Sequence, residues 1–220
     1  MDMGGALRAT ICELPPPPLG INRALMRFIL NNMVIWAVLA LPGLGMLAGY
    51  FTGRTDAMDM LHPTGEFAVR FMVAAMAIGP LHDLVGPRGW TRWLLARRRW
   101  LGFAAFLYAL GHLVFYLVDM GTLGDVLAEI TEHGIWTGWV AMLLMAVPGL
   151  TSTDAAMRHL RRGWKQLQRL AYPAALFTAL HWILLEWHWV PAAVHFGPLV
   201  LLNLARVARL VSRPGKENIA

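Results

Sequence analysis

The sequence is poor in charged residues and has almost no cysteine. Asp, Glu, Lys and Arg make up 15% of its 220 residues, and 57% of the residues are hydrophobic. A soluble domain carries about a quarter charged residues, so this composition excludes an ordinary soluble domain. The single Cys12 excludes an internal disulfide. The sequence contains no HExxH, GxSxG, Walker, paired CxxC or GxGxxG motif, so we expect no nicotinamide- or flavin-binding domain and no soluble appendage.

The hydrophobic residues gather in six runs that predict membrane spans. The runs cover residues 26–51, 66–82, 100–118, 135–150, 167–185 and 190–210. A helix needs about 20 residues to cross the hydrocarbon core, so the second and fourth runs are short. We expect an all-α fold, in which six helices form one transmembrane domain over residues 26–211. A proline-containing tail (1–25) and a short tail (212–220) would flank it, with a core built mainly from the second to fifth spans.

The basic residues predict the orientation of these spans. They gather before the first span, between the second and third, between the fourth and fifth, and after the sixth, whereas the other connections hold mainly acidic residues. The positive-inside rule then places both termini in the cytoplasm. The formal net charge of +6 is therefore a topology signal and not a sign of nucleic-acid binding.

Two histidines, His112 and His181, lie inside predicted spans that run in the same direction. Counting from Asp119 and Glu186, both lie about 8–10 Å below the outer surface. A titratable group inside a membrane is costly and marks a functional site by default. Two imidazoles at one depth can ligate a haem iron from its two axial faces. A membrane histidine can also be a helix–helix hydrogen-bonding group, and a histidine pair can ligate the magnesium of a chlorophyll-type pigment.

Other residues near this depth could complete a haem pocket. Arg70, on the second span, suits a haem propionate, although it could instead extend to the membrane interface. Gly111 leaves room for a flat macrocycle beside the backbone. Three aromatic residues could pack against the macrocycle: Phe115, Tyr116 and Trp182.

The remaining histidines give weaker indications of a functional site. Nothing in the sequence pairs His195, which lies inside the sixth span. His62, His133, His159 and His188 fall in or beside connections, where solvated surface is expected, and His82 ends the second span.

Several stretches resemble one membrane family. They are residues 150–154, 158–160 and 163–167, the helix with His181 and Trp182, residues 62–65, Arg70, residues 79–81, and residues 98–102 leading to Gly111, His112 and Leu113. The sequence is similar there to haem-bearing membrane subunits of bacterial periplasmic methionine-sulfoxide reductase systems, within the ferric-reductase-like transmembrane family. The resemblance covers residues 61–187.

This resemblance implies a six-helix b-type cytochrome of the bacterial inner membrane. Such a subunit passes electrons from a membrane quinol or a cytoplasmic flavin to a periplasmic reductase that repairs oxidised methionines. The resemblance implies that His112 and His181 ligate the haem.

The sequence departs from the family pattern at Gln168, where the subunits it resembles carry a second histidine. A glutamine amide is a poor iron ligand. We therefore expect one haem b, unless an inner site is built differently. Two function classes follow: an electron-transfer subunit of an oxidoreductase, or a non-redox structural, pigment- or haem-holding subunit of a larger membrane complex.

Overall fold

The computed structural model describes residues 32–186 and 189–212, and every regular element among them is a helix. The helices are α2 (Asn32–Phe51), α3 (Ala57–Val85), α4 (Gly89–Met120), α5 (Leu123–Glu129), α6 (His133–Leu150), α7 (Asp154–Leu160), α8 (Arg162–Gln168), α9 (Ala171–Glu186) and α10 (Trp189–Val211). The chain divides into two compact units, residues 1–38 and 39–220. The described residues of the first unit form the start of α2; the following paragraphs concern the second. The predicted tail over residues 1–25 and residues 213–220 of the other tail lie outside the described residues.

Five of these helices are long and apolar enough to cross a membrane: α2, α3, α4, α6 and α10. The all-α prediction is therefore confirmed for the described residues. The predicted fifth span is divided between α8 and α9, and α9 has 16 residues. It rises about 24 Å, which is less than the hydrocarbon core of about 30 Å. Pro173 lies in the first turn of α9, where the missing N–H of proline is tolerated, and so favours a new helix start there.

The starts of two helices differ from the predicted boundaries. Helix α4 begins at Gly89, eleven residues before the predicted Trp100, and α3 begins at Ala57, nine residues before the predicted Glu66. Asp56 accepts a hydrogen bond from the Asp59 amide (2.9 Å), and the Asp59 carboxylate accepts one from the Asp56 amide (3.2 Å). This capping box fixes the helix start, while polar residues in the first turns hide it from a hydropathy count. Glu66 therefore lies in the third turn of α3. The prediction that it lies at the outer end of the helix is wrong.

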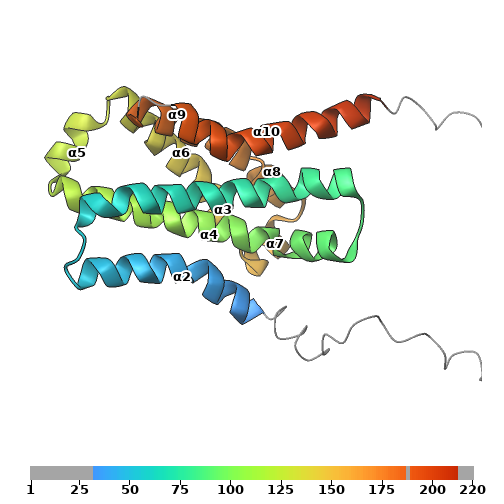
Figure 1. Cartoon of the computed structure of the whole chain (residues 1–220), viewed down its shortest axis with the longest axis horizontal. Coiled ribbons are helices and arrows are strands. Elements are labelled where there is room, and N and C mark those ends of the chain that lie inside the picture. Colours follow the sequence, from blue (N-terminus) through green and yellow to red (C-terminus); the bar gives the residue numbers. More distant parts are fainter. Residues whose placement is uncertain (1–31, 187–188, 213–220) are drawn as a thin grey trace, which may run out of the picture. The chain divides into compact units, whose positions relative to one another are not determined.

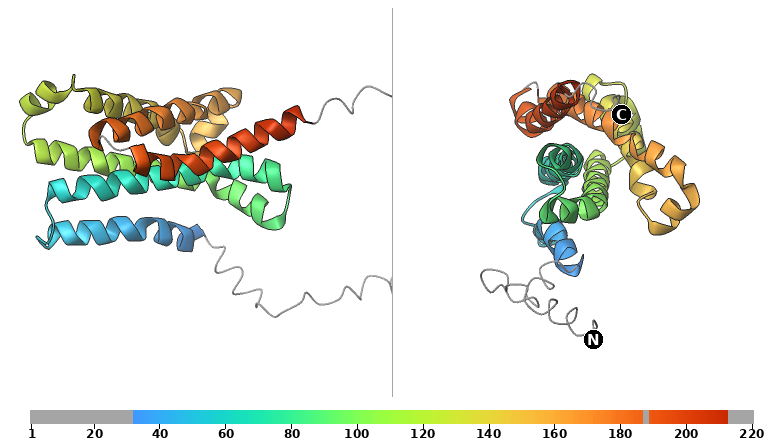
Figure 2. Two further views of the ribbon diagram at one scale, coloured as in Figure 1. Left: turned by 45° about the horizontal axis from the view of Figure 1, so that its top comes forward. Right: turned by 90° about the vertical axis from the view of Figure 1, so that its right-hand side faces the viewer.

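Helices α3 and α4 form an antiparallel pair joined by residues 86–88 (Figures 1 and 2). Helix α6 pairs with α9, and α10 packs on α3. We call the end that holds α5 and residues 52–56 the outer end, and the end that holds α7 and residues 86–88 the inner end, after the predicted orientation.

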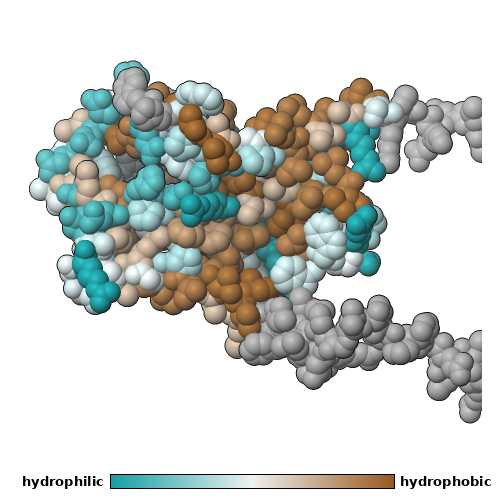
Figure 3. Space-filling view, viewed as in Figure 1, coloured by the Kyte–Doolittle hydropathy of each residue, from teal (hydrophilic) through white to brown (hydrophobic). Residues whose placement is uncertain are grey.

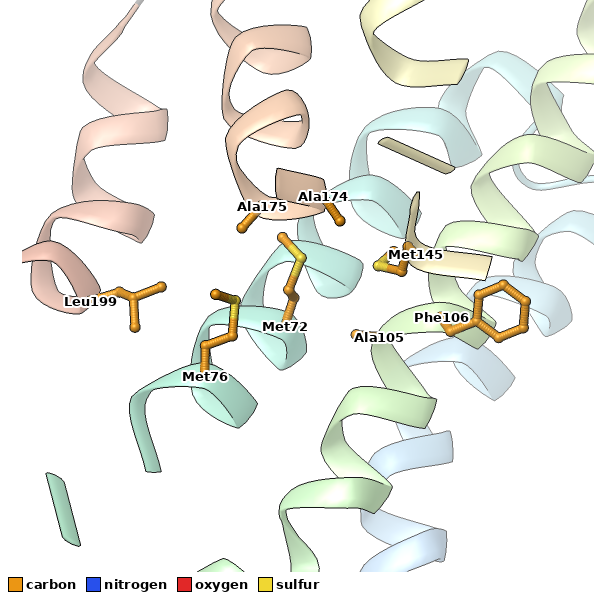
Figure 4. Close-up of a cluster of buried hydrophobic side chains, with 8 residues drawn as sticks. All are labelled: Met72, Met76, Ala105, Phe106, Met145, Ala174, Ala175 and Leu199. Carbon is orange, nitrogen blue, oxygen red and sulfur yellow. The ribbon is translucent and has the colours of Figure 1, made fainter. Parts of the chain in front are cut away.

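The core lies where five helices meet (Figure 4). Its members are Met72 and Met76 of α3, Ala105 and Phe106 of α4, Met145 of α6, Ala174 and Ala175 of α9, and Leu199 of α10. Alanines allow the helices to approach closely, and methionines fill the irregular gaps between them. The predicted core, built from the second to fifth spans, is confirmed, and α10 adds Leu199 to it.

The outward faces of the helices are apolar. Leu41, Leu143, Leu176 and Leu201 are each at least 60% exposed. Hydrophobic side chains cover much of the middle of the face in Figure 3, and hydrophilic side chains gather at the end where α5 lies. Exposed apolar surface of this extent is expected where lipid, and not water, surrounds the helices.

Candidate functional site

A cavity of about 480 Å³ lies among α3, α4, α6 and α9 towards the outer end. This volume is within the usual range of ligand pockets, about 300–1,000 Å³. Most lining residues are apolar, but His112 and His181 both line the cavity, as do Tyr116 and Trp182. The structure therefore brings together the two histidines that the sequence singled out.

The imidazole of His112 is oriented by α3. Its Nδ1 lies 2.9 Å from the carbonyl oxygen of Leu61. Gly65, one turn further along α3, faces the same ring, and a Cβ at Gly65 would lie 3.2 Å from His112 Nδ1. The glycine thus allows the imidazole to lie close against the α3 backbone.

The imidazole of His181 is oriented in the same way by α6. Its Nδ1 lies 2.7 Å from the carbonyl oxygen of Gly134. A Cβ at Gly138 would lie only 2.6 Å from His181 Cε1, so only glycine leaves room for this ring. Gly134 and Gly138 form a GxxxG pattern, a signal of close helix approach that could have indicated this contact from the sequence.

These contacts determine which ring nitrogen of each histidine is available. A carbonyl oxygen only accepts hydrogen bonds, so Nδ1 carries the proton in His112 and in His181. Each Nε2 then keeps its lone pair, the arrangement usual for metal-ligating histidines.

The centroids of the His112 and His181 rings lie 6.2 Å apart, with ring planes at 84°. An imidazole nitrogen lies about 2 Å from a first-row metal and its ring centroid about 1 Å further back, so two opposed ligands need a centroid spacing of about 6 Å. The observed pair fits that spacing.

Two further predicted site residues lie away from the cavity lining. Arg70 bonds Glu66 through Nη2 at 2.5 Å, and its guanidinium carbon lies 4.9 Å from the centre of the Phe67 ring. A Cβ at Gly111 would meet nothing within 4 Å. Arg70 also lies further along its helix than predicted, about 20 Å from the first residue of α3. Phe115 packs in a separate cluster with Ala57 and Met60, so of the three aromatic residues only Tyr116 and Trp182 line the cavity.

A polar cluster that the sequence did not predict lies at the cavity wall. The Glu66 carboxylate lies between Arg70 and His195, whose Nε2 is 3.5 Å from Glu66 Oε1. His195 therefore has a partner, contrary to our expectation. The i,i+4 spacing of Glu66 and Arg70 was a signal for this pair, but the predicted span boundary placed Glu66 at the membrane surface.

At the inner end, Gln168 is engaged in packing. Its Nε2 donates to the Pro148 carbonyl oxygen (3.1 Å) and to Thr151 Oγ1 (3.4 Å). Trp164 Nε1 donates to the Thr151 carbonyl oxygen at 2.9 Å. These side chains satisfy carbonyl groups at the end of α6, which have no partner within the helix. Gln168 thus ties α8 to the last turn of α6.

Comparison with known proteins gives a consistent result. Residues 64–179 match the family described as ferric reductase like transmembrane component. A protein-methionine-sulfoxide reductase heme-binding subunit MsrQ from Rhizobium meliloti (strain 1021) is 32% identical over 192 residues, which is 83% of this chain and 83% of the relative. The subunit with the same name from Xanthomonas euvesicatoria pv. vesicatoria (strain 85-10) is 36% identical over 164 residues, 73% of each chain. No solved structure matches the chain.

The family match includes His112, Gly65, Gly134 and Gly138; it begins three residues after Leu61 and ends two residues before His181. The described helices, their apolar outer faces and the breadth of these matches agree. The chain belongs to the ferric-reductase-like transmembrane family.

Proposed function

We propose that the chain is a membrane b-type cytochrome that holds one haem between His112 and His181. One observation carries this proposal: both imidazoles donate through Nδ1 to the backbone of a neighbouring helix, which leaves both Nε2 atoms as ligands beside one cavity. His112 and His181 would hold the haem iron through these two nitrogens. The relatives above are named as heme-binding subunits, which supports the same assignment.

When bound, the haem supplies one-electron redox chemistry. The chain itself orients both imidazoles and surrounds the cavity with apolar side chains that limit the access of water. Trp182 and Tyr116 offer aromatic faces to the cofactor. We propose Arg70 and Gly111 as further cofactor-binding residues. The Arg70 guanidinium would be shared between a haem propionate and Glu66.

We further propose that the chain holds a single haem. Gln168 lies where the family resemblance implies a second histidine, and its amide is already hydrogen-bonded to the end of α6. Nearby on α4, Arg99 pairs with Asp154 at 2.5 Å. These groups stabilise the inner end of the bundle and offer no imidazole to an iron.

In this proposal the chain serves a methionine-sulfoxide reductase. Electrons come from a membrane quinol or a cytoplasmic flavin and pass to a periplasmic reductase, across or from the bacterial inner membrane. Helix α9 acts as a short sixth span, and both termini lie in the cytoplasm. The charge distribution supports this orientation, since the inner end carries Arg97, Arg98 and Arg99 whereas the outer end carries Asp125 and Glu132.

An absorption spectrum of the purified full chain tests the function. We expect a dithionite-reducible haem with the α-band of a low-spin six-coordinate b-type haem. Reduction of reconstituted vesicles by a quinol, or by reduced flavin added outside, then identifies the donor. A chain without dithionite-reducible haem would be a structural or pigment-holding subunit, and the proposal would be wrong.

Cysteine labelling tests the orientation. Arg92→Cys at the inner end and Glu132→Cys at the outer end are matched exposed positions, placed in a Cys12→Ser background. We expect a membrane-impermeant maleimide added to spheroplasts to label only Glu132→Cys. Labelling of Arg92→Cys from the periplasmic side would reverse the proposed topology.

A further inference from the structure

The polar cluster beside the cavity lies on two helices long and apolar enough to cross a membrane, where ionisable groups are costly. Glu66 is the tenth residue of α3 and lies about 14 Å along the helix from its start. Its side chain is 22% exposed and that of His195 on α10 is 18% exposed. Intramembrane ionisable groups mark proton relays or ligand sites, and the proposed haem ligation uses neither residue.

The contacts of His195 show that this cluster has a place for one proton. His195 Nδ1 lies 2.8 Å from the Pro191 carbonyl oxygen and must donate to it. His195 Nε2 faces Glu66 Oε1 at 3.5 Å. A neutral imidazole with this tautomer and an ionised carboxylate would direct two lone pairs at each other, so a proton on either atom removes the repulsion.

Arg70 offsets the negative charge of Glu66. With His195 neutral, Arg70 and ionised Glu66 carry opposite charges, and the proposed haem propionate beside Arg70 adds one negative charge. An electron that enters the cavity adds further negative charge, which favours an extra proton on the Glu66–His195 pair in a low-dielectric setting. Glu66 lines the cavity in which an electron would arrive.

One face of α3 carries titratable groups from its outer turns to the cluster. His62, Glu66 and Arg70 are spaced four residues apart and so share that face. The His62 side chain is 64% exposed, and its Nδ1 lies 3.2 Å from Glu186 Oε1. The other titratable groups that line the same cavity are His112, Tyr116 and Asp119 of α4, Glu129 of α5, and His181 and Glu186 of α9.

We infer that Glu66 and His195 form a redox-linked proton site, which binds one proton from the outer side when an electron enters the cavity and releases it when the electron leaves. This inference rests on the proposed haem function. The electron comes from the quinol or flavin donor, and the proton comes from water at the outer end. The proton forms one N–H bond on His195 or one O–H bond on Glu66, and this bond breaks again when the electron leaves. No other covalent bond changes.

The test is the pH dependence of the haem midpoint potential in the purified full chain. Electron entry favours the protonated pair, so the potential should fall as pH rises between about pH 5 and pH 8, where imidazoles titrate. One proton per electron gives a limit of about 59 mV for each tenfold change in proton concentration. Glu66→Gln and His195→Gln should each reduce the wild-type slope at least twofold. The matched outer-end variants Glu132→Gln and His133→Gln, which lie outside the cavity lining, should keep it.

Two further measurements keep the inference open to contradiction. If a variant loses its haem, its potential cannot be measured. Proton uptake by the wild-type chain on reduction is then measured instead, with an indicator dye in weak buffer. Uptake approaching one proton per electron supports the site. A haem-containing wild type with a pH-independent potential, or unchanged slopes in both Glu66→Gln and His195→Gln, would overturn the proton site and leave the haem function intact. Absence of haem from the wild type would instead contradict the proposed function.

Discussion

The outer and inner ends of the bundle differ in how much of the hydrogen-bonding capacity of their polar side chains is used in packing. At the outer end, His112 and His181 each use one ring nitrogen to hold the imidazole in place and keep the other beside a cavity. At the inner end, Gln168 uses its amide protons to satisfy the carbonyl groups of α6. The comparison teaches that a polar side chain between helices indicates a ligand site only if a donor or acceptor remains after packing is satisfied.

The largest expected effect follows from removing either outer imidazole. His112→Ala or His181→Ala should abolish the six-coordinate haem, because a low-spin state needs both axial ligands. The absorption spectrum of each purified variant measures this. His133→Ala and His159→Ala are controls, since both residues are exposed and neither lines the cavity. A six-coordinate spectrum retained in either ligand variant would remove that histidine from the site.

The next largest effect should come from a single methyl group on α6. In Gly138→Ala the new Cβ would lie 2.6 Å from His181 Cε1, so the imidazole must move. We expect a loss of about tenfold in haem retention, which corresponds to about 1.4 kcal/mol, measured by transfer of haem to an excess of apomyoglobin. Gly102→Ala on α4 is the matched control, because a Cβ there would meet nothing within 4 Å. Equal haem loss from both variants would show that the methyl group acts through general destabilisation.

A smaller effect is expected from the cation that accompanies Glu66. Arg70→Leu removes a positive charge from the neighbourhood of the cavity, which favours the oxidised haem and lowers the midpoint potential. The Arg70 side chain is already paired with Glu66, so that carboxylate offsets its charge and the shift should be modest. A potentiometric titration checks this. An unchanged potential with haem fully bound would assign Arg70 to the membrane interface and not to a propionate.

The inner end should show the smallest effect on the cofactor. Gln168→Leu removes the hydrogen bonds to the end of α6 and should lower the free energy of unfolding by about 1 kcal/mol. The haem spectrum and haem content should stay at wild-type values. Thermal unfolding in detergent and haem quantification on the same sample measure both quantities. A loss of one haem from this variant would mean that the inner end holds a cofactor.

The sequence was sufficient to predict the helical class, most of the spans and the proximity of His112 and His181. Hydropathy counts residues one at a time, so it reports long apolar runs well and polar helix turns poorly. For this reason it missed the first nine residues of α3 and treated Glu66 as a surface residue. The break between α8 and α9 depends on local backbone geometry near Pro173, which an average over an apolar window does not resolve.

The details of the site depend on pairs of helices that the sequence does not place side by side. The carbonyl groups of Leu61 and Gly134 orient the two imidazoles, and every residue has a carbonyl, so no residue type marks this role. Gly138 and the Glu66–His195 contact likewise become visible only when helices are packed. The GxxxG pattern on α6 and the i,i+4 spacing on α3 were the available signals.

The haem content of the purified full chain tests the central claim most directly. A pyridine haemochrome assay with protein quantification, together with a low-temperature electron paramagnetic resonance spectrum of the oxidised protein, gives both number and ligation. The account predicts one haem b per chain and one low-spin signal, which His112→Ala or His181→Ala removes. Two haems per chain, two low-spin signals, or a chain without haem would contradict it.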